Sequence, residues 1–197
     1  MTLNKNTFRK NCLQKLRSSH KHNRFYKNSL INRKLLKLIN PKRREKILFY
    51  YPLMMEADIR KTLNILRQNC DIYIPFMVGE SFKMVPFRLP LVKKKFGIYE
   101  AGNTNLDIKK IDIAIVPTVG IDGNLQRVGF GKGMYDRFFE KLRKRPYTIF
   151  TQLELCHTKE FICDEYDITC DLLITPRKDI GIKNVKRDTA RWRNCHS

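Results

Sequence analysis

The chain reads Ile111-Asp112-Ile113-Ala114-Ile115-Val116-Pro117 and then, after a turn at residues 122–124, Arg127-Val128-Gly129-Phe130-Gly131-Lys132-Gly133-Met134-Tyr135-Asp136-Arg137. The first run is aliphatic and ends at a proline, which indicates a buried strand. The second run has glycine at alternate positions and leads into residues 135–142, whose pattern predicts a helix. The stretch therefore predicts a strand, a glycine-rich loop and a helix in that order.

A strand-helix-strand pattern lies upstream of this stretch. Residues 47–51 form an aliphatic and aromatic run ended by a proline, apolar residues recur at helical spacing at 59, 63 and 66, and residues 72–74 form another strand-like run. The crossover of such a unit is normally right-handed and places both strands parallel in one sheet. The sequence therefore predicts the α/β class.

The remaining segments fit one domain over residues 1–176, followed by a basic C-terminal tail at 177–197. Apolar spacing over residues 26–39 predicts one helix of an N-terminal pair. Residues 93–103 are polar and contain turn-forming residues, so we expect a loop there. Further strands are expected at 82–89, 147–150 and 172–174.

Size and composition limit the possible classes of protein. The 197 residues are 42% hydrophobic, which suits one substantial core, and no apolar run approaches the roughly 18 residues of a membrane span. The basic N-terminal residues lack the apolar segment of a secretory signal, so we expect a cytoplasmic protein. The six cysteines include no close pair, and we expect reduced thiols. The group Cys156, His157, Cys163 and Cys170 matches no standard zinc spacing.

Forty Lys and Arg residues against nineteen Asp and Glu give a net charge of +21, which raises nucleic-acid binding as a hypothesis. Much of this charge lies at the two ends of the chain, and neither an aromatic RNA-binding motif nor a paired-cysteine finger accompanies it. A polyanionic small substrate would attract the same charge. Nucleic-acid binding is therefore kept as an alternative and ranked below small-molecule chemistry.

The alternating glycines at 129, 131 and 133 let backbone N–H groups turn toward a ligand and approach it closely, which suits phosphate oxygens. The N-terminus of the following helix adds partial positive charge, and Arg127 and Lys132 add full charges. The run matches neither the P-loop nor the dinucleotide-binding fingerprint. The glycines by themselves are equally typical of a flexible turn.

The whole run is more specific than its glycines. Arg-x-Gly-x-Gly-x-Gly-x-Tyr-Asp-Arg over residues 127–137, preceded by residues 112–117 and Gly120, closely resembles the signature of the 5-formyltetrahydrofolate cyclo-ligase family. The resemblance extends from about Lys10 to Thr175. It includes Glu56, Phe82-Lys83-Met84, Phe87-Arg88, Gly97-Ile98-Tyr99-Glu100 and residues 167–175.

The resemblance implies both a fold and an activity. Members of this family are single-domain Rossmann-like three-layer α/β proteins with a mostly parallel sheet. They convert 5-formyltetrahydrofolate and ATP to 5,10-methenyltetrahydrofolate, ADP and phosphate with Mg²⁺. We therefore expect an ATP-dependent ligase of one-carbon folate metabolism that is a monomer or weak dimer. Its substrate is 5-formyltetrahydrofolate, with or without a polyglutamate tail.

The resemblance also implies roles for individual residues. Arg127 and Lys132 are expected to be catalytic, and Asp136 and Asp167 are expected to bind Mg²⁺. ATP contacts are expected from Lys10, Arg127, Val128, Gly129, Phe130, Gly131, Lys132, Gly133, Met134 and Tyr135. Folate contacts are expected from Tyr51, Glu56, Phe96, Phe130 and Met134. Ordinary structural roles also fit some of them: Glu56 and Asp136 as helix caps, Asp167 as a solvated charge and Phe96 as core.

The chain departs from the family near its N-terminus. The family has Lys-x-x-Leu-Arg there, whereas this chain has Lys10, Leu13 and then Gln14. One expected phosphate contact is therefore missing. Arg9 and Arg17 are alternative sources of positive charge, although each also fits an ordinary surface role. The departure keeps open a second hypothesis, a folate- or nucleotide-binding protein without turnover.

Overall fold

The computed structural model describes residues 3–20, 23–39, 44–94, 97–106, 108 and 110–181. Its centre is a seven-stranded sheet with the order β11-β10-β9-β6-β1-β2-β3. The strands of this sheet are β1 (Lys46–Leu48), β2 (Asp71–Val78), β3 (Ser81–Pro86), β6 (Ile113–Pro117), β9 (Tyr147–Thr151), β10 (Leu172–Ile174) and β11 (Ile180–Gly181). The helices are α1 (Lys5–His20), α2 (Arg24–Leu38), α3 (Arg60–Leu66) and α4 (Met134–Glu140).

The inner part of the sheet is parallel. β1 pairs in parallel with both β2 and β6, and β9 pairs in parallel with β6 and β10. Only the edge strands β3 and β11 run antiparallel to their neighbours. All five residues of β6 are buried, because helices cover both faces of a parallel sheet. The predicted α/β class with a mostly parallel sheet is confirmed.

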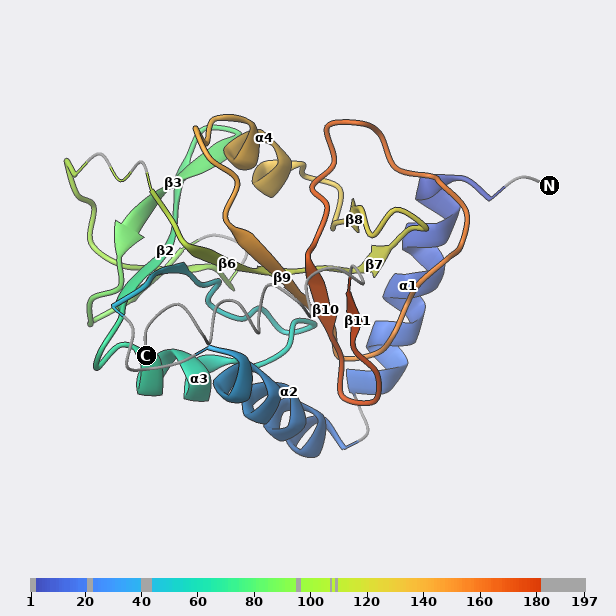
Figure 1. The fold of residues 1–197 in the computed structure, drawn as a ribbon, viewed down its shortest axis with the longest axis horizontal. Helices are drawn as coiled ribbons and strands as arrows, with labels where there is room; N and C mark the ends of the chain where they lie inside the picture. Colours follow the sequence, from blue (N-terminus) through green and yellow to red (C-terminus); the bar gives the residue numbers. More distant parts are fainter. Residues whose placement is uncertain are drawn as a thin grey trace, which may run out of the picture.

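The molecule has three layers (Figure 1). Helices α2 and α3 lie on one face of the sheet and α4 lies on the other. Alternate residues of each strand face opposite layers. Thus Ile113 and Ile115 belong to the core beside α2 and α3, whereas Ala114 and Val116 belong to the core beside α4. The predicted three-layer arrangement is therefore confirmed.

The connections between the parallel strands define a preferred place for a ligand. Helix α3 lies in the connection from β1 to β2 on one face, and α4 lies in the connection from β6 to β9 on the other (Figure 1). The chain therefore leaves the neighbouring strands β1 and β6 toward opposite sides of the sheet. In doubly wound folds, ligands bind in the crevice outside the carboxyl ends of such strands. We expect the site where residues follow β1 and β6.

Helix α1 packs beside the small hairpin of β7 (Gly120–Ile121) and β8 (Arg127–Val128) (Figure 1). Its buried residues Phe8, Cys12 and Leu16 are spaced four apart and form one stripe. The contact is close at Gly120, where a Cβ atom would lie 2.6 Å from the Phe8 ring. Glycine at this position therefore lets the helix approach the hairpin.

One expectation about the cysteines is wrong. Cys12 and Cys156 form a disulfide across a sequence separation of 144 residues, while Cys163 and Cys170 carry free thiols as expected. Sequence spacing gives no sign of the bridge, because folding alone brings α1 beside the segment that follows β9. The disulfide joins α1 covalently to the body of the domain.

Several boundaries differ from the sequence prediction. β2 continues through Pro75 to Val78. β1 pairs with β2 only as far as Tyr73, so Pro75 has a strand partner on one side only. Proline is tolerated at such a position because one side of the strand needs no backbone N–H donor there. The expected loop at 93–103 contains part of a hairpin, β4 (Val92–Lys93) with β5 (Tyr99–Glu100). The expected tail boundary at 177 precedes β11, and residues 182–197 lie outside the described ranges. Among the described residues, every helix is too short or too polar to cross a bilayer.

Candidate active site

The glycine loop lies at the expected edge of the sheet. Residues 129–133 connect β8 to α4, so the loop follows the carboxyl end of β6 through the β7–β8 hairpin. Gly131 has φ 102° and Gly133 has φ 59°. Residues with a side chain rarely adopt this left-handed region, which explains glycine at both positions. The backbone path of the loop therefore depends on these two residues.

Arg127 lies beneath the loop and is 5% exposed. Its Nε donates to the Pro117 carbonyl oxygen at 3.0 Å, and its Nη1 lies 3.5 Å from Asp136 Oδ2. Its guanidinium also lies over the Tyr135 ring, 5.0 Å from the centroid. A Cβ atom on Gly129 would lie 2.5 Å from Nη1. Arg127 therefore supports the loop from below, and its predicted contact with phosphate stays a prediction.

The outer part of the loop carries the other predicted residues. Lys132 is exposed at the tip, and its carbonyl oxygen accepts a hydrogen bond of 2.6 Å from Arg137 Nη2. Arg137 Nε also donates to the carbonyl oxygen of Glu80 at 3.1 Å, which ties the loop to the β2–β3 turn. Phe130 is half-buried and packs against the core. The loop thus presents the exposed Lys132 side chain on a braced backbone.

Glu56 is the buried acid of the site, with 8% of its surface exposed. It follows β1, and its Oε2 accepts a hydrogen bond of 2.8 Å from the backbone N–H of Leu53. Burial raises the pKa of Glu56 to about 7, although the Leu53 N–H and the charge of Arg127 act in the opposite direction. The connections from β1 and β6 leave toward opposite faces of the sheet, and the place where they diverge is the topological switch point of the fold. A buried carboxyl beside β1 and a buried guanidinium beside β6 therefore flank this switch point.

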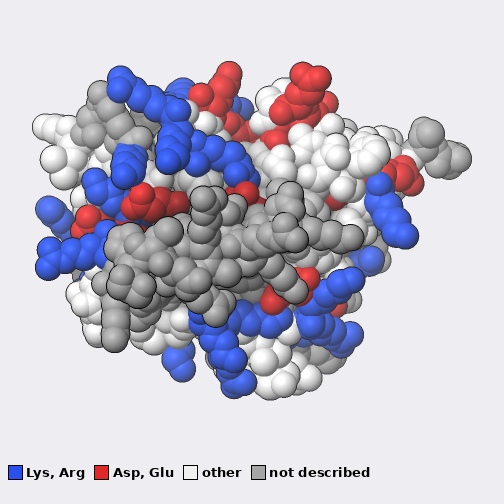
Figure 2. All heavy atoms as spheres, viewed as in Figure 1, with Lys and Arg blue, Asp and Glu red and all other residues white. Residues whose placement is uncertain are grey.

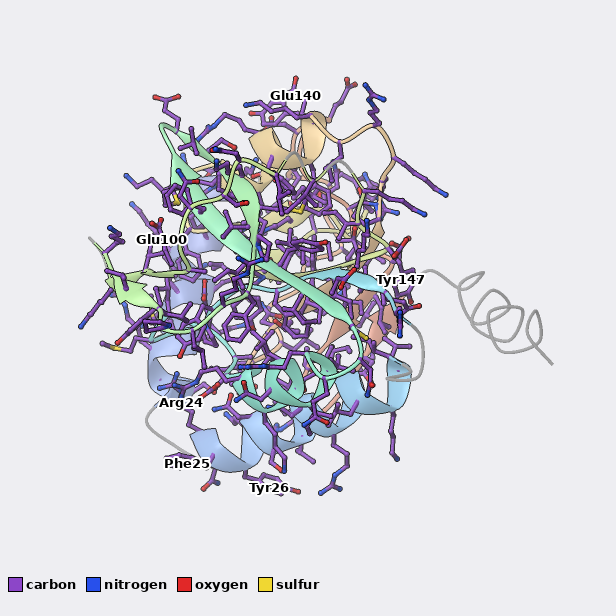
Figure 3. All side chains as sticks on the ribbon, turned by 90° about the vertical axis from the view of Figure 1, so that its left-hand side faces the viewer. Arg24, Phe25, Tyr26, Glu100, Glu140 and Tyr147 are labelled. Carbon is purple, nitrogen blue, oxygen red and sulfur yellow. A yellow bond between two sulfur atoms is a disulfide. The ribbon has the colours of Figure 1, made fainter. Side chains whose placement is uncertain are left out.

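Tyr51 follows β1, as Glu56 does, and is half-buried. Its ring centroid is 5.1 Å from that of Tyr99 on β5 and lies 5.9 Å from the guanidinium of Arg60. The hairpin carrying Tyr99 is fixed by Glu100, labelled in Figure 3, whose Oε1 accepts a hydrogen bond of 3.0 Å from the Met77 N–H. Phe96, the remaining predicted folate contact, lies outside the described residues.

The two predicted magnesium ligands lie near each other but have different partners. Asp136 Oδ1 accepts a 3.3 Å hydrogen bond from the backbone N–H of Ile168, the residue after Asp167. Asp167 Oδ2 forms an ion pair with Lys5 and accepts a 2.7 Å hydrogen bond from the Asp164 N–H. Mg²⁺ takes one or two carboxylates together with phosphate and water oxygens. Asp136, held only by long contacts beside the glycine loop, fits this role better than Asp167.

No cluster of three or more His, Cys, Asp or Glu side chains suited to a metal occurs within the described ranges. Cys156, one of the four residues that match no standard zinc spacing, lies in the disulfide with Cys12.

Helix α1 reaches the loop through a residue that the sequence analysis treated as an alternative. Arg9 Nε donates to the Gly129 carbonyl oxygen at 2.9 Å. Lys10 and Gln14 are exposed residues of the same helix. The sequence reasoning missed Lys5 altogether. Lys5 and Arg9 are four residues apart and lie in phase with the buried stripe of α1. This spacing was the signal that could have indicated that Lys5 and Arg9 face the body of the domain.

A separate hollow of about 460 Å³ lies between β3, residues 104–106 with Ile108, and the C-terminal end of α4. Phe82, Met84 and Phe138 form its apolar part. None of the predicted site residues that the structure describes lines it. The candidate site is therefore defined by its loop, its buried charges and its place at the switch point rather than by cavity size.

The fold and the site define a class, an α/β protein with a braced glycine loop at a topological switch point. A family model described as the 5-formyltetrahydrofolate cyclo-ligase family matches residues 1–176. The chain belongs to this family, which confirms the resemblance and the class of enzyme, a ligase.

Relatives and solved structures agree with this membership. The chain is 27% identical to the 5-formyltetrahydrofolate cyclo-ligase of Mycoplasma pneumoniae, over 87% of this chain and 98% of that protein. It is 26% identical to the enzyme of the same name from Mycoplasma genitalium, with the same coverage, 87% and 98%. The fold matches the NMR structure of the Aquifex aeolicus 5,10-methenyltetrahydrofolate synthetase with a TM-score of 0.75 at 23% identity, covering 91% of this chain and 93% of that chain. It also matches the Mycoplasma pneumoniae synthetase structure with a TM-score of 0.69 at 23% identity, covering 89% and 100%.

Proposed function

We propose that this protein catalyses the ATP-dependent cyclisation of 5-formyltetrahydrofolate to 5,10-methenyltetrahydrofolate, with release of ADP and phosphate. The observation that carries this proposal is the family match over residues 1–176, within which the braced glycine loop and the buried Glu56 flank the switch point. We further propose that the enzyme acts in the cytoplasm as a monomer or weak dimer.

The reaction needs ATP because an amide oxygen is a poor leaving group. The formyl oxygen on N5 attacks the γ-phosphorus of ATP, and ADP leaves with the electron pair of the broken P–O bond. N10 then attacks the activated formyl carbon, the ring closes, and phosphate departs as N10 loses its proton. The protein's main tasks are to align the formyl oxygen with the phosphate and to neutralise phosphate charge.

The residues of the site divide these tasks between them. The backbone N–H groups of residues 129–133 and the Lys132 ammonium bind phosphate oxygens, and Arg127 fixes the loop from below and adds positive charge. Lys10 is proposed to contact ATP from α1. Glu56 and Tyr51 hold the folate, with Glu56 accepting hydrogen bonds from pterin N–H donors. Phe130 and Met134 border the folate from the loop.

Mg²⁺, when bound, supplies charge neutralisation at the ATP phosphates. Asp136 is proposed as its main protein ligand, because the carboxylate lies directly after the loop. Asp167 is proposed as a second ligand, which requires Lys5 to release Oδ2. Both carboxylates therefore contribute through the metal rather than by touching the folate.

Asp136→Asn is expected to raise the Mg²⁺ concentration required for half-maximal rate by about tenfold or more. Asparagine accepts the Ile168 hydrogen bond and suits a helix N-terminus as well as aspartate does, so folding should be kept. The measurement is initial rate against Mg²⁺ concentration at saturating folate and ATP. Asp112→Asn is the control, because Asp112 lies before the amino end of β6. An unchanged Mg²⁺ curve removes Asp136 from the site.

The basic surface is proposed to favour folates with a polyglutamate tail. Figure 2 shows Lys and Arg over several separate parts of one face. Long-range attraction of anions is screened by salt, so the kcat/KM of the polyglutamate form should fall more steeply with ionic strength than that of the monoglutamate. Equal salt dependence of the two substrates contradicts this proposal.

The test of the proposed activity is direct. Purified protein is mixed with 5-formyltetrahydrofolate, with and without MgATP, and the absorbance of the methenyl product is followed. Product that appears only with MgATP supports the enzyme. Folded protein that binds folate without turnover would support the alternative of a non-catalytic folate- or nucleotide-binding protein. Protein that binds only nucleic acid would support the alternative of a nucleic-acid-binding protein. Membership of a ligase family favours turnover over both.

A further inference from the structure

Two buried hydroxyl groups lie beside the segment that carries Glu56. Tyr50 follows β1 and is 2% exposed, and Thr151, the last residue of β9, is 1% exposed. The Tyr50 hydroxyl lies 2.8 Å from Thr151 Oγ1 and donates to the Ala57 carbonyl oxygen at 2.7 Å. Because β6 lies between β1 and β9 in the sheet, the contact of Tyr50 with Thr151 crosses the strand between them. The residue after Glu56 is therefore tied to the centre of the sheet.

The direction of these hydrogen bonds follows from their chemistry. A carbonyl oxygen only accepts, so the single proton of the Tyr50 hydroxyl goes to Ala57. The Tyr50 oxygen must then accept the proton of the Thr151 hydroxyl. The order is therefore Thr151 to Tyr50 to Ala57, and both hydroxyl protons are used. Removing the Tyr50 hydroxyl leaves the buried Ala57 oxygen without this donor, which is costly away from water.

The backbone around Glu56 is held on both sides. On one side, Glu56 Oε2 accepts from the Leu53 N–H at 2.8 Å, and the Glu56 N–H donates to the Leu53 carbonyl oxygen at 3.1 Å. On the other side, Tyr50 holds the oxygen of the peptide that precedes Asp58, and the Asp58 N–H donates to Asn28 Oδ1 at 2.9 Å. Because a peptide unit is planar, fixing its oxygen and its N–H fixes its orientation. Glu56 therefore lies between two anchored peptides before a ligand binds.

We propose that Tyr50 is a positioning residue for the folate. Through the Ala57 carbonyl it fixes the backbone that carries Glu56, so that the Glu56 carboxylate stays where it can accept hydrogen bonds from the pterin. Hydrogen bonds weaken steeply when they are misaligned, so a small shift of this backbone lowers affinity. With 2% of its surface exposed, Tyr50 acts through Glu56 rather than by touching the ligand. This inference rests on the proposed function, in which Glu56 binds the folate.

Tyr50→Phe is expected to raise the Kd for 5-formyltetrahydrofolate by about tenfold, the scale of one well-placed hydrogen bond. The Kd for MgATP should change by less than about twofold, because Arg127 rather than Tyr50 supports the glycine loop. The matched control is Tyr73→Phe, which removes a hydroxyl from a buried tyrosine of β2 in the core on the other face of the sheet. Tyr73→Phe should keep wild-type affinity for both ligands.

Thr151 provides a second pair of variants. Thr151→Val removes the proton that Tyr50 accepts, so it should weaken folate binding in the same direction and by less than Tyr50→Phe. Thr151→Ser keeps the hydroxyl and should bind folate as the wild type does. If Tyr50→Phe does not fold, this pair decides: weaker folate binding in Thr151→Val than in Thr151→Ser supports the proposal, and equal binding overturns it.

The decisive experiment is a double-mutant cycle, measured by calorimetric titration of the full chain with 5-formyltetrahydrofolate and, separately, with MgATP. In the Glu56→Gln background, Tyr50→Phe should change the folate Kd by less than about threefold, because its effect passes through Glu56. A full loss of folate affinity in both backgrounds would overturn the proposal. Parallel losses of folate and MgATP affinity in Tyr50→Phe would also overturn it, in favour of a general loosening of the fold.

Melting temperatures of the same variants separate positioning from folding. A lower melting temperature of Tyr50→Phe with unaltered folate affinity would mean that the hydroxyl serves folding alone, and would overturn the proposal. Titration requires no turnover, so a wild type that binds no folate counts against the proposed function. Wild-type folate affinity in Tyr50→Phe counts against the role of Tyr50.

Discussion

Gly129→Ala is expected to lower kcat/KM by about a thousandfold, on the order of 4 kcal/mol of transition-state stabilisation. The new Cβ atom would lie 2.5 Å from Arg127 Nη1 and 2.8 Å from its Cζ. Flexible side chains often move away from such a clash, but this guanidinium is buried and donates to Pro117. Either Arg127 loses its contacts or the loop leaves its position, and both outcomes misplace phosphate-binding groups.

Steady-state kinetics of the folded variant test this expectation. Gly102→Ala provides the matched control, because a Cβ atom on Gly102 has no atom within 4 Å and the residue has no positive φ. Gly102→Ala should therefore keep wild-type kinetics. If Gly129→Ala keeps activity within about threefold of wild type, the support of the loop by Arg127 has no part in catalysis.

Glu56→Gln is expected to stabilise the protein without ligand at pH 8 while weakening folate binding. The pKa of Glu56 is raised from 4.5 to about 7 by burial, so the folded state holds the proton more tightly than the unfolded state. This contribution to stability is fully present below about pH 4.5 and is lost as pH rises through about 7. The pKa difference between the folded and unfolded states corresponds to about 3 kcal/mol of stability at most. Glutamine does not ionise, so the variant avoids this loss at high pH.

Urea unfolding at pH 5 and pH 8 tests the stability half of this prediction. The advantage of Glu56→Gln over wild type should grow between the two pH values. Folate binding should weaken by about 1.5 to 3 kcal/mol, the scale of a lost hydrogen bond to a charged group, with little change in ATP affinity. Glu140→Gln, at the exposed end of α4 (Figure 3), should change neither property. A Glu56→Gln advantage that is independent of pH would mean that Glu56 ionises normally in the folded protein.

The sequence by itself determined the elements whose signals are local. The aliphatic runs that became β1, β6 and β9 are buried on both faces, and such continuous runs are typical of parallel strands. The glycines at 131 and 133 were predicted as loop residues, and their positive φ angles are a property of the residue type. Boundaries were less exact, as at β2, because a strand's end depends on its neighbours.

Only the tertiary structure decided which charged residues meet. Arg9, Lys5 and Cys12 meet Gly129, Asp167 and Cys156, each more than a hundred residues away, and no local pattern encodes such separations. The raised pKa of Glu56 likewise arises from burial by segments distant in sequence. Periodicity reports which face of an element is buried, whereas contacts and desolvation depend on what packs against that face. For this reason the sequence indicated the glycine loop, and the folded chain alone placed Arg9 against it.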